Sequence, residues 1–121
     1  MRTYDLTIGF QSGVTVLTSV IVSGPLNGGA TAPTTTFTYA NYANRGDGAF
    51  PHPRLATVQN GWGGKAGFTY GNDGRSSTSS WYNWRVSQLD IQDGLTANGA
   101  TDMRTVFAYV TPCYNDKPDN G

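Results

Sequence analysis

One group of side chains in this sequence has the types suited to binding a small polar ligand. Trp62 is flanked by Gly61 and by Gly63 and Gly64, which leaves a large indole with little around it to bury it. An exposed aromatic plane can stack on a sugar ring while amide, carboxylate and guanidinium groups hydrogen-bond the hydroxyls. The sequence predicts a ligand site made of Asn60, Trp62, Asn72, Asp73, Arg75, Trp81 and Asn83. For Trp81, as for Trp84, packing in a core or an interface is the favoured interpretation.

Groups that could perform catalysis are scarce. His52 is the only histidine and lies between two prolines, and Cys113 is the only cysteine. No Gly-x-Ser-x-Gly segment supports a serine nucleophile. A glycosidase needs two carboxylates, yet the chain has no Glu, and most of its eight Asp lie beside turn-forming residues. We therefore expect no enzymatic activity.

Metal and recognition motifs are equally sparse. One His and one Cys do not make the usual zinc sets. Calcium needs only oxygen ligands, which Asn72 and Asp73 could supply, but no EF-hand loop is present. We expect no cofactor, with calcium left open. The tripeptide at 45–47 (Arg-Gly-Asp) matches an integrin-recognition sequence, but three such residues arise readily by chance in a turn.

The composition favours strands and limits the partners. Among 121 residues there are sixteen Thr and sixteen Gly, only two Lys and no Glu, so the common residues of exposed helices are nearly missing. The formal net charge is zero, which removes the basic surface expected of a nucleic-acid-binding protein. The sequence predicts an all-β protein that does not bind nucleic acid.

The organisation of the chain is that of one domain. We expect a single β-sandwich domain at 1–111 and a C-terminal tail at 112–121, which has two prolines and no apolar run. The start of the chain does not resemble a classical signal peptide, and no apolar run is long enough to span a membrane as a helix. These patterns favour a soluble protein and leave its location open between the cytoplasm, non-classical release and a processed secreted chain.

Periodicity predicts seven strands. Tyr4, Leu6, Ile8 and Phe10 alternate with polar residues, and a β-branched run follows at 14–22, so the first 22 residues predict a hairpin. Further strands are expected at 34–42, 54–59, 65–70, 81–91 and 103–111. Within 81–91 the apolar phase slips by one residue, which indicates a β-bulge near Ser87 and Gln88. About seven short strands separated by Gly, Asn and Pro turns predict an antiparallel β-sandwich, jelly-roll or Ig-like, or a small barrel.

Two functions are consistent with these patterns. The first is a non-enzymatic carbohydrate-binding module, a small lectin that uses the aromatic and polar loop residues. The alternative is a self-assembling structural subunit of a virus or phage particle or of a filament. Apolar residues on both faces of the strands at 14–22 and 103–110 suit burial between copies, and low net charge does not oppose association. Both interpretations predict a homo-oligomer.

Overall fold

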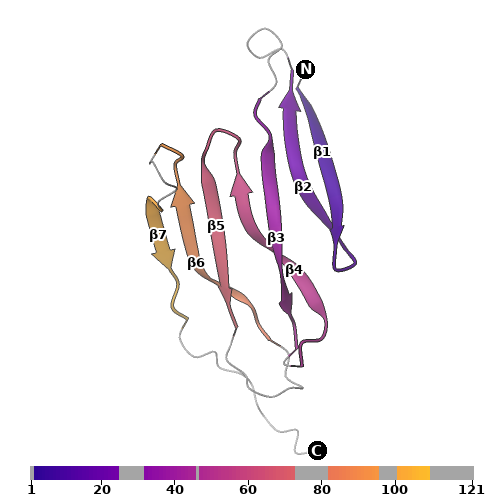
Figure 1. Ribbon diagram of the computed structural model, residues 1–121, viewed down its shortest axis with the longest axis vertical. Helices are drawn as coiled ribbons and strands as arrows, with labels where there is room; N and C mark the ends of the chain where they lie inside the picture. The colour runs from indigo at the N-terminus through magenta and orange to yellow at the C-terminus, as the bar shows by residue number, and fades with distance from the viewer. Residues whose placement is uncertain (1, 25–31, 46, 73–81, 96–100, 110–121) are drawn as a thin grey trace, which may run out of the picture.

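The computed structural model shows one open sheet of seven antiparallel strands in the order in which they occur along the chain (Figure 1). It describes residues 2–24, 32–45, 47–72, 82–95 and 101–109. The strands are β1 (Thr3–Gln11), β2 (Val14–Ser23), β3 (Thr35–Ala43), β4 (Pro51–Gln59), β5 (Lys65–Gly71), β6 (Arg85–Gln92) and β7 (Met103–Val106).

All seven expected strands are present, and the all-β class is confirmed. The sheet does not close, however, and the described residues form one layer where a sandwich or barrel was expected. Local connections explain this, because each strand pairs with its neighbour in sequence and no described strand crosses to a second sheet. Three bounds also differ: His52 lies within β4 rather than in a loop, Trp84 precedes β6, and the strand expected at 103–111 ends at Val106. The expected tail at 112–121 lies outside the described residues.

The first hairpin follows directly from its sequence. Ser12 and Gly13 both have positive φ, 49° and 75°, as a two-residue type I′ turn requires. The register from Gln11↔Val14 shifts between Thr7 and Ile8, which leaves Thr18 of β2 without a partner on β1. Simple alternation along β2 would put Val16 and Val20 on the same face of the sheet, but the bulge moves them to opposite faces.

The sheet consists of three long hairpins joined by short ladders. β1–β2, β3–β4 and β5–β6 pair along most of their length, whereas β2–β3 is joined only at Ser19↔Thr36 and Val20↔Thr35. β4–β5 is joined at the three pairs that run from Thr57↔Gly67 to Gln59↔Lys65. Beyond these ladders the neighbouring hairpins need other contacts to hold them together.

Aromatic side chains provide those contacts by donating to backbone carbonyls. Tyr39 Oη donates to the carbonyl of Leu17 at 2.8 Å, joining β3 to β2, and Tyr70 Oη donates to the carbonyl of Leu55 at 2.9 Å, joining β5 to β4. Trp84 Nε1 donates to Ala43 at 2.8 Å and so joins the start of β6 to the end of β3. Each bond satisfies a backbone acceptor between hairpins.

A second bulge confirms the phase slip expected near Ser87. Thr69 pairs with Gln88 and Tyr70 pairs with Val86, so Ser87 is the extra residue of β6. Its hydroxyl donates to the carbonyl of Thr69 at 3.1 Å. The side chain thus makes a bond at the position where the ladder register is broken.

The register separates the side chains into two faces, because directly opposed residues of neighbouring strands share a face. One face, called here the apolar face, carries Tyr4, Leu6, Ile8, Phe10, Leu17, Val20, Val22, Phe37, Tyr39, Leu55, Val58, Ala66, Phe68, Leu89, Ile91 and Met103. The opposite face, called the polar face, carries Thr3, Asp5, Thr7, Ser19, Thr36, Thr38, Thr57, Gln59, Lys65, Thr69, Gln88, Asp90, Gln92 and Arg104, with Val14, Val16, Ile21, Ala40, Tyr42 and Val106 as apolar or aromatic exceptions.

Very little of this sheet is buried. Within the described residues only Val16, at 9% exposure, and Pro53 are buried. The four apolar side chains of β1 are 58% to 78% exposed. The part of the chain that the structure describes contains no helix long and apolar enough to cross a membrane. Of the sixteen residues of the apolar face, the four on β1 and Met103 are exposed and the other eleven are half-buried.

We expect Tyr39→Phe to destabilise the sheet, because it removes the hydroxyl that joins β3 to β2 while keeping the ring. The loss should be about 1 kcal/mol, the usual net value of such a bond. Urea unfolding at one fixed protein concentration measures it. Tyr4→Phe is the matched control, since Tyr4 is 58% exposed, and it should leave the midpoint unchanged. Equal midpoints for the two variants would contradict the assignment.

Candidate functional site

The β4–β5 turn holds Trp62, the central residue of the expected ligand site. Asn60 Oδ1 accepts hydrogen bonds from the backbone N–H of Trp62 at 2.8 Å and of Gly64 at 3.0 Å. Gly61 and Gly63 have φ of 74° and 94°, which L side chains rarely adopt. The indole of Trp62 is 75% exposed, as expected, but the Asn60 carbonyl oxygen serves the turn.

The structure does not bring the other expected residues to Trp62. Asn72 follows the far end of β5 and Asn83 precedes β6 at that same end. β5 has seven residues, so the two ends lie about 20 Å apart. The remaining expected residues, Asp73, Arg75 and Trp81, lie outside the described residues. The described members therefore form two separate groups, and ligand binding by them stays a prediction.

A groove beside the Trp62 turn includes residues that the sequence analysis did not select. It has a volume of about 450 Å³ and is lined by Gln59, Lys65, Gln92 and the turn glycines. These three long polar side chains come from three neighbouring strands. The polar alternation of each strand was the available signal, but only the pairing Gln59↔Lys65↔Gln92 shows that they are adjacent.

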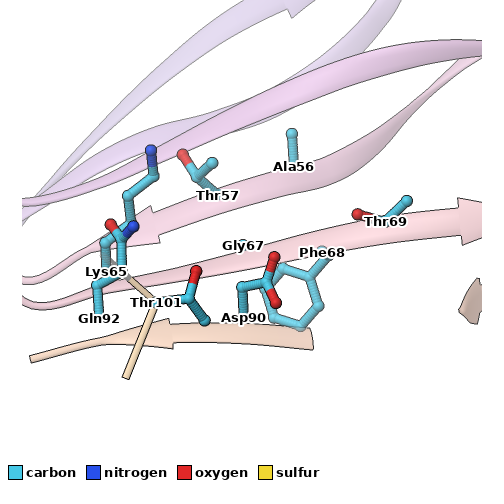
Figure 2. Close-up of a pocket in the computed structure, with 9 residues that line it drawn as sticks. All are labelled: Ala56, Thr57, Lys65, Gly67, Phe68, Thr69, Asp90, Gln92 and Thr101. Atoms are coloured by element: carbon cyan, nitrogen blue, oxygen red, sulfur yellow. The ribbon is translucent and has the colours of Figure 1, made fainter. Parts of the chain in front are cut away.

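The polar face has a further hollow of about 290 Å³ over β4, β5 and β6 (Figure 2). Lys65, Thr57 and Asp90 project into it, whereas the ring of Phe68 points to the other side of its strand. A cation, a carboxylate and hydroxyl groups on one open surface can hydrogen-bond a small polar molecule.

Asp90 is held in its ionised form. Arg104 donates to its carboxylate from Nε at 2.7 Å and from a terminal nitrogen at 3.2 Å, and Gln88 donates at 2.8 Å. The bonds from Arg104 are the main cause of an Asp90 pKa below its usual value. This carboxylate is thus an acceptor already engaged by neighbours on β6 and β7.

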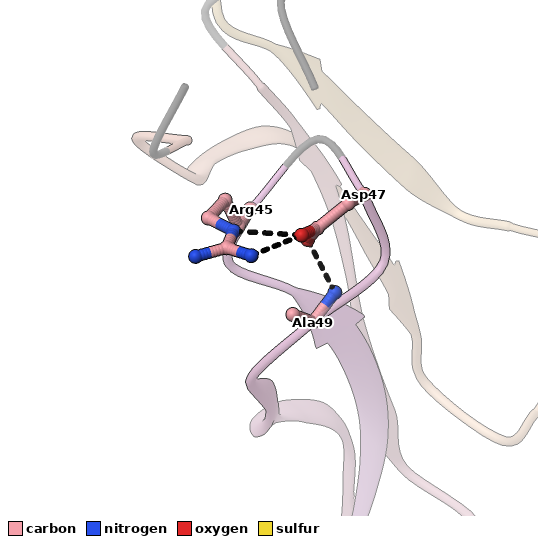
Figure 3. A network of polar contacts seen from close by, with 3 residues as sticks. All are labelled: Arg45, Asp47 and Ala49. Atoms are coloured by element: carbon pink, nitrogen blue, oxygen red, sulfur yellow. Dashed lines mark hydrogen bonds and ion pairs between the residues drawn. The ribbon is translucent and has the colours of Figure 1, made fainter. Parts of the chain in front are cut away.

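The turn before β4 contains the Arg45 and Asp47 side chains (Figure 3). Arg45 forms an ion pair with Asp47 and donates to it from Nε at 2.9 Å, while the N–H of Ala49 donates to the other oxygen at 2.9 Å. These bonds lower the pKa of Asp47 to about 2. Both carboxylate oxygens are engaged within the turn, which argues against their display to an integrin.

An aromatic cluster lies at the end of the sheet opposite Trp62. The ring centroids of Tyr42 and Trp84 are 4.6 Å apart, and those of Tyr42 and Tyr70 are 5.3 Å apart. Tyr82 approaches Trp84 edge-on at 5.9 Å, and its N–H donates to Asn44 at 2.8 Å. Burial raises the pKa of Tyr70. Trp84 therefore packs within the protein, one of the two roles left open for it.

Within the described ranges, no three His, Cys, Asp or Glu residues are grouped so as to hold a metal ion. His52 is exposed and lies opposite Tyr42 in the β3–β4 ladder.

Comparison with known proteins adds no assignment. No protein-family model matches the chain, and searches of curated proteins and of solved structures give no match.

We expect the Asp47 carboxyl to titrate with a pKa of about 2 in the folded protein. Because this pKa is lowered by folding, the stabilisation of the turn is present above the ordinary Asp pKa and is lost as the pH falls towards about 2. Arg45→Gln should return the pKa towards its usual value, as carboxyl NMR can measure. Arg104→Gln is the matched control, and it should raise the pKa of Asp90 alone. An unchanged Asp47 midpoint in Arg45→Gln would refute the pairing.

Proposed function

We propose that this protein is a structural subunit that assembles with copies of itself, as in a virus or phage particle or a filament. The observation that carries the proposal is the apolar face: sixteen apolar or aromatic residues from seven strands share one side of a single layer. A sheet with such a face needs a second layer against it to be stable. In this proposal the expected sandwich forms between copies rather than within one chain.

The rest of the chain is poorly suited to supply that layer. Outside the described residues the only large apolar side chains in the sequence are Met1, Leu26, Trp81, Val110 and Tyr114. These five residues are scattered among Gly, Ser, Thr, Asn, Asp and Pro. They are too few to cover the sixteen side chains of the apolar face. In this proposal the second layer comes from a second copy of the chain.

The burial of the described strands supports the same conclusion. Among the described residues only Val16 and Pro53 are buried, and the four apolar side chains of β1 are 58% to 78% exposed. An apolar face with such exposed side chains gains free energy when another layer covers it.

A change on each face of β5 tests the proposal. Light scattering after size exclusion, with electron microscopy, should show wild-type assemblies of many copies. We expect Phe68→Lys to reduce the assembled mass, because it places a charge on the apolar face. Thr69→Lys is the matched control on the polar face and should leave the mass unchanged.

Folding is followed by circular dichroism, and Met103→Lys gives a second variant of the apolar face at an exposed position. A wild-type protein that stays monomeric at all concentrations would refute the proposed function. Equal loss of mass in Phe68→Lys and Thr69→Lys would show that the apolar face is not the interface.

Carbohydrate binding is a second candidate, and the exposed Trp62 favours it. The glycines that flank Trp62 line a groove together with Gln59, Lys65 and Gln92, whose polar ends could hydrogen-bond sugar hydroxyls. This site is smaller than the one expected from the sequence, because Asn72 and Asn83 lie at the other end of β5.

We expect Trp62→Ala to weaken any glycan binding by at least about tenfold, because stacking on the ring is lost. Trp62→Tyr, which keeps an aromatic plane, should retain most of it. A glycan array followed by calorimetry measures both variants. If the wild-type protein binds no glycan of a broad array, the second candidate is rejected and the structural proposal is unaffected.

A further inference from the structure

We propose that the free edge of β1 pairs antiparallel with β1 of a second copy about a two-fold axis at Thr7, making one continuous sheet. This inference rests on the proposed function and names one of its contacts. β1 is the first strand of the sheet order, and no described strand pairs with its outer side (Figure 1). Its nine residues contain no Pro and no Lys. The extra residue of the bulge is on β2, so β1 itself is regular. Such an edge lacks the usual protection against pairing.

The backbone groups on this edge can be assigned. Thr18 Oγ1 donates to the carbonyl of Thr7 at 3.1 Å, so that carbonyl points towards β2. Successive residues of an antiparallel strand direct their N–H and C=O groups to opposite sides. The N–H and C=O groups of Leu6 and Ile8 therefore point to the free edge.

A two-fold axis at Thr7 makes β1 complementary to itself. All nine residues then pair, with Leu6 opposite Ile8 and Tyr4 opposite Phe10 on the apolar face. Leu6 and Ile8 are both outward-facing, as a hydrogen-bonded pair requires. On the polar face Asp5 lies opposite Gly9, so the only charge of the strand does not meet itself. An axis two residues earlier would place Asp5 against Asp5, and like charges directly opposite destabilise a ladder.

The other edge of the sheet is less suited to this role. β7 has four residues, and short edge strands resist pairing. A two-fold β1 contact also extends the apolar face without covering it. Edge pairing and stacking on the apolar face are therefore separate contacts, and a subunit that makes both can build a layered assembly.

A cysteine at the axis tests the pairing. In a Cys113→Ser background the introduced thiol is the only one. Residues at Thr7 of two copies form a non-hydrogen-bonded pair with Cα atoms about 4.5 Å apart, within the range of a disulfide. We expect Thr7→Cys to assemble to the same mass as the wild-type protein and to form a covalent dimer on mild oxidation. Thr3→Cys is exposed on the same face of β1 but lies about 27 Å from its counterpart in this register, so it should cross-link at least about tenfold more slowly.

A charge pair at Gly9 tests the register independently. Gly9→Asp places a carboxylate opposite Asp5 of the second copy twice per contact, and Gly9→Lys places an ammonium there. Both variants crowd Thr18 equally, because a Cβ at Gly9 would lie 3.1 Å from its methyl group. We expect the dissociation constant of the β1 contact to be at least about threefold higher in Gly9→Asp than in Gly9→Lys. Analytical ultracentrifugation at low salt measures the difference.

The outcomes separate the two proposals. Wild-type assembly without preferential cross-linking of Thr7→Cys overturns the β1 pairing and leaves the proposed function standing. Equal cross-linking of Thr7→Cys and Thr3→Cys, or equal constants for the two Gly9 variants, also overturns this register. A wild-type protein that remains monomeric removes the proposed function and this inference together.

Discussion

The rest of this structure depends on one constraint: a single-layer sheet cannot cover its own apolar face. In a sandwich each sheet buries the inner face of the other, but here one face of seven strands carries sixteen apolar or aromatic side chains, and the described residues form no second layer against it. Only Val16 and Pro53 are buried in the described part of the chain. If the protein assembles as proposed, burial of this face against a second copy adds to the free energy of folding and links folding to association.

Backbone hydrogen bonds within hairpins and side-chain hydrogen bonds between hairpins hold the strands of the layer together. Three hairpins pair strands that are neighbours in sequence, so the contacts of the sheet are more local in sequence than those between the two sheets of a sandwich. Between hairpins the ladders are only two and three pairs long. Tyr39, Tyr70 and Trp84 extend these joints by donating to backbone carbonyls of the neighbouring hairpin. The aromatic residues thus contribute to the continuity of the sheet as well as to its apolar area.

The candidate ligand residues illustrate how distance along the chain differs from distance in space. Asn60 and Trp62 are close to Asn72 in sequence, yet β5 runs between them and places them at opposite ends of the sheet. Lys65 and Gln92 are far apart in sequence but directly opposed across the β5–β6 ladder. In a meander sheet the register between strands decides which side chains are neighbours in a site. A single sequence indicates that register only where the turn between two strands is well defined.

The sequence by itself determined the seven strands, the tight turn at Ser12 and Gly13, and the bulge at Ser87. Each has a local physical signal: strict alternation, residues that tolerate positive φ, and a one-residue slip of apolar phase. The bulge at Thr18 gave no such signal, because β-branched and apolar residues surround it on both phases. The number of layers was decided only by the tertiary structure. Alternation shows that a face is apolar. What covers that face depends on contacts between distant strands or separate molecules, and such contacts produce no periodic pattern in the sequence.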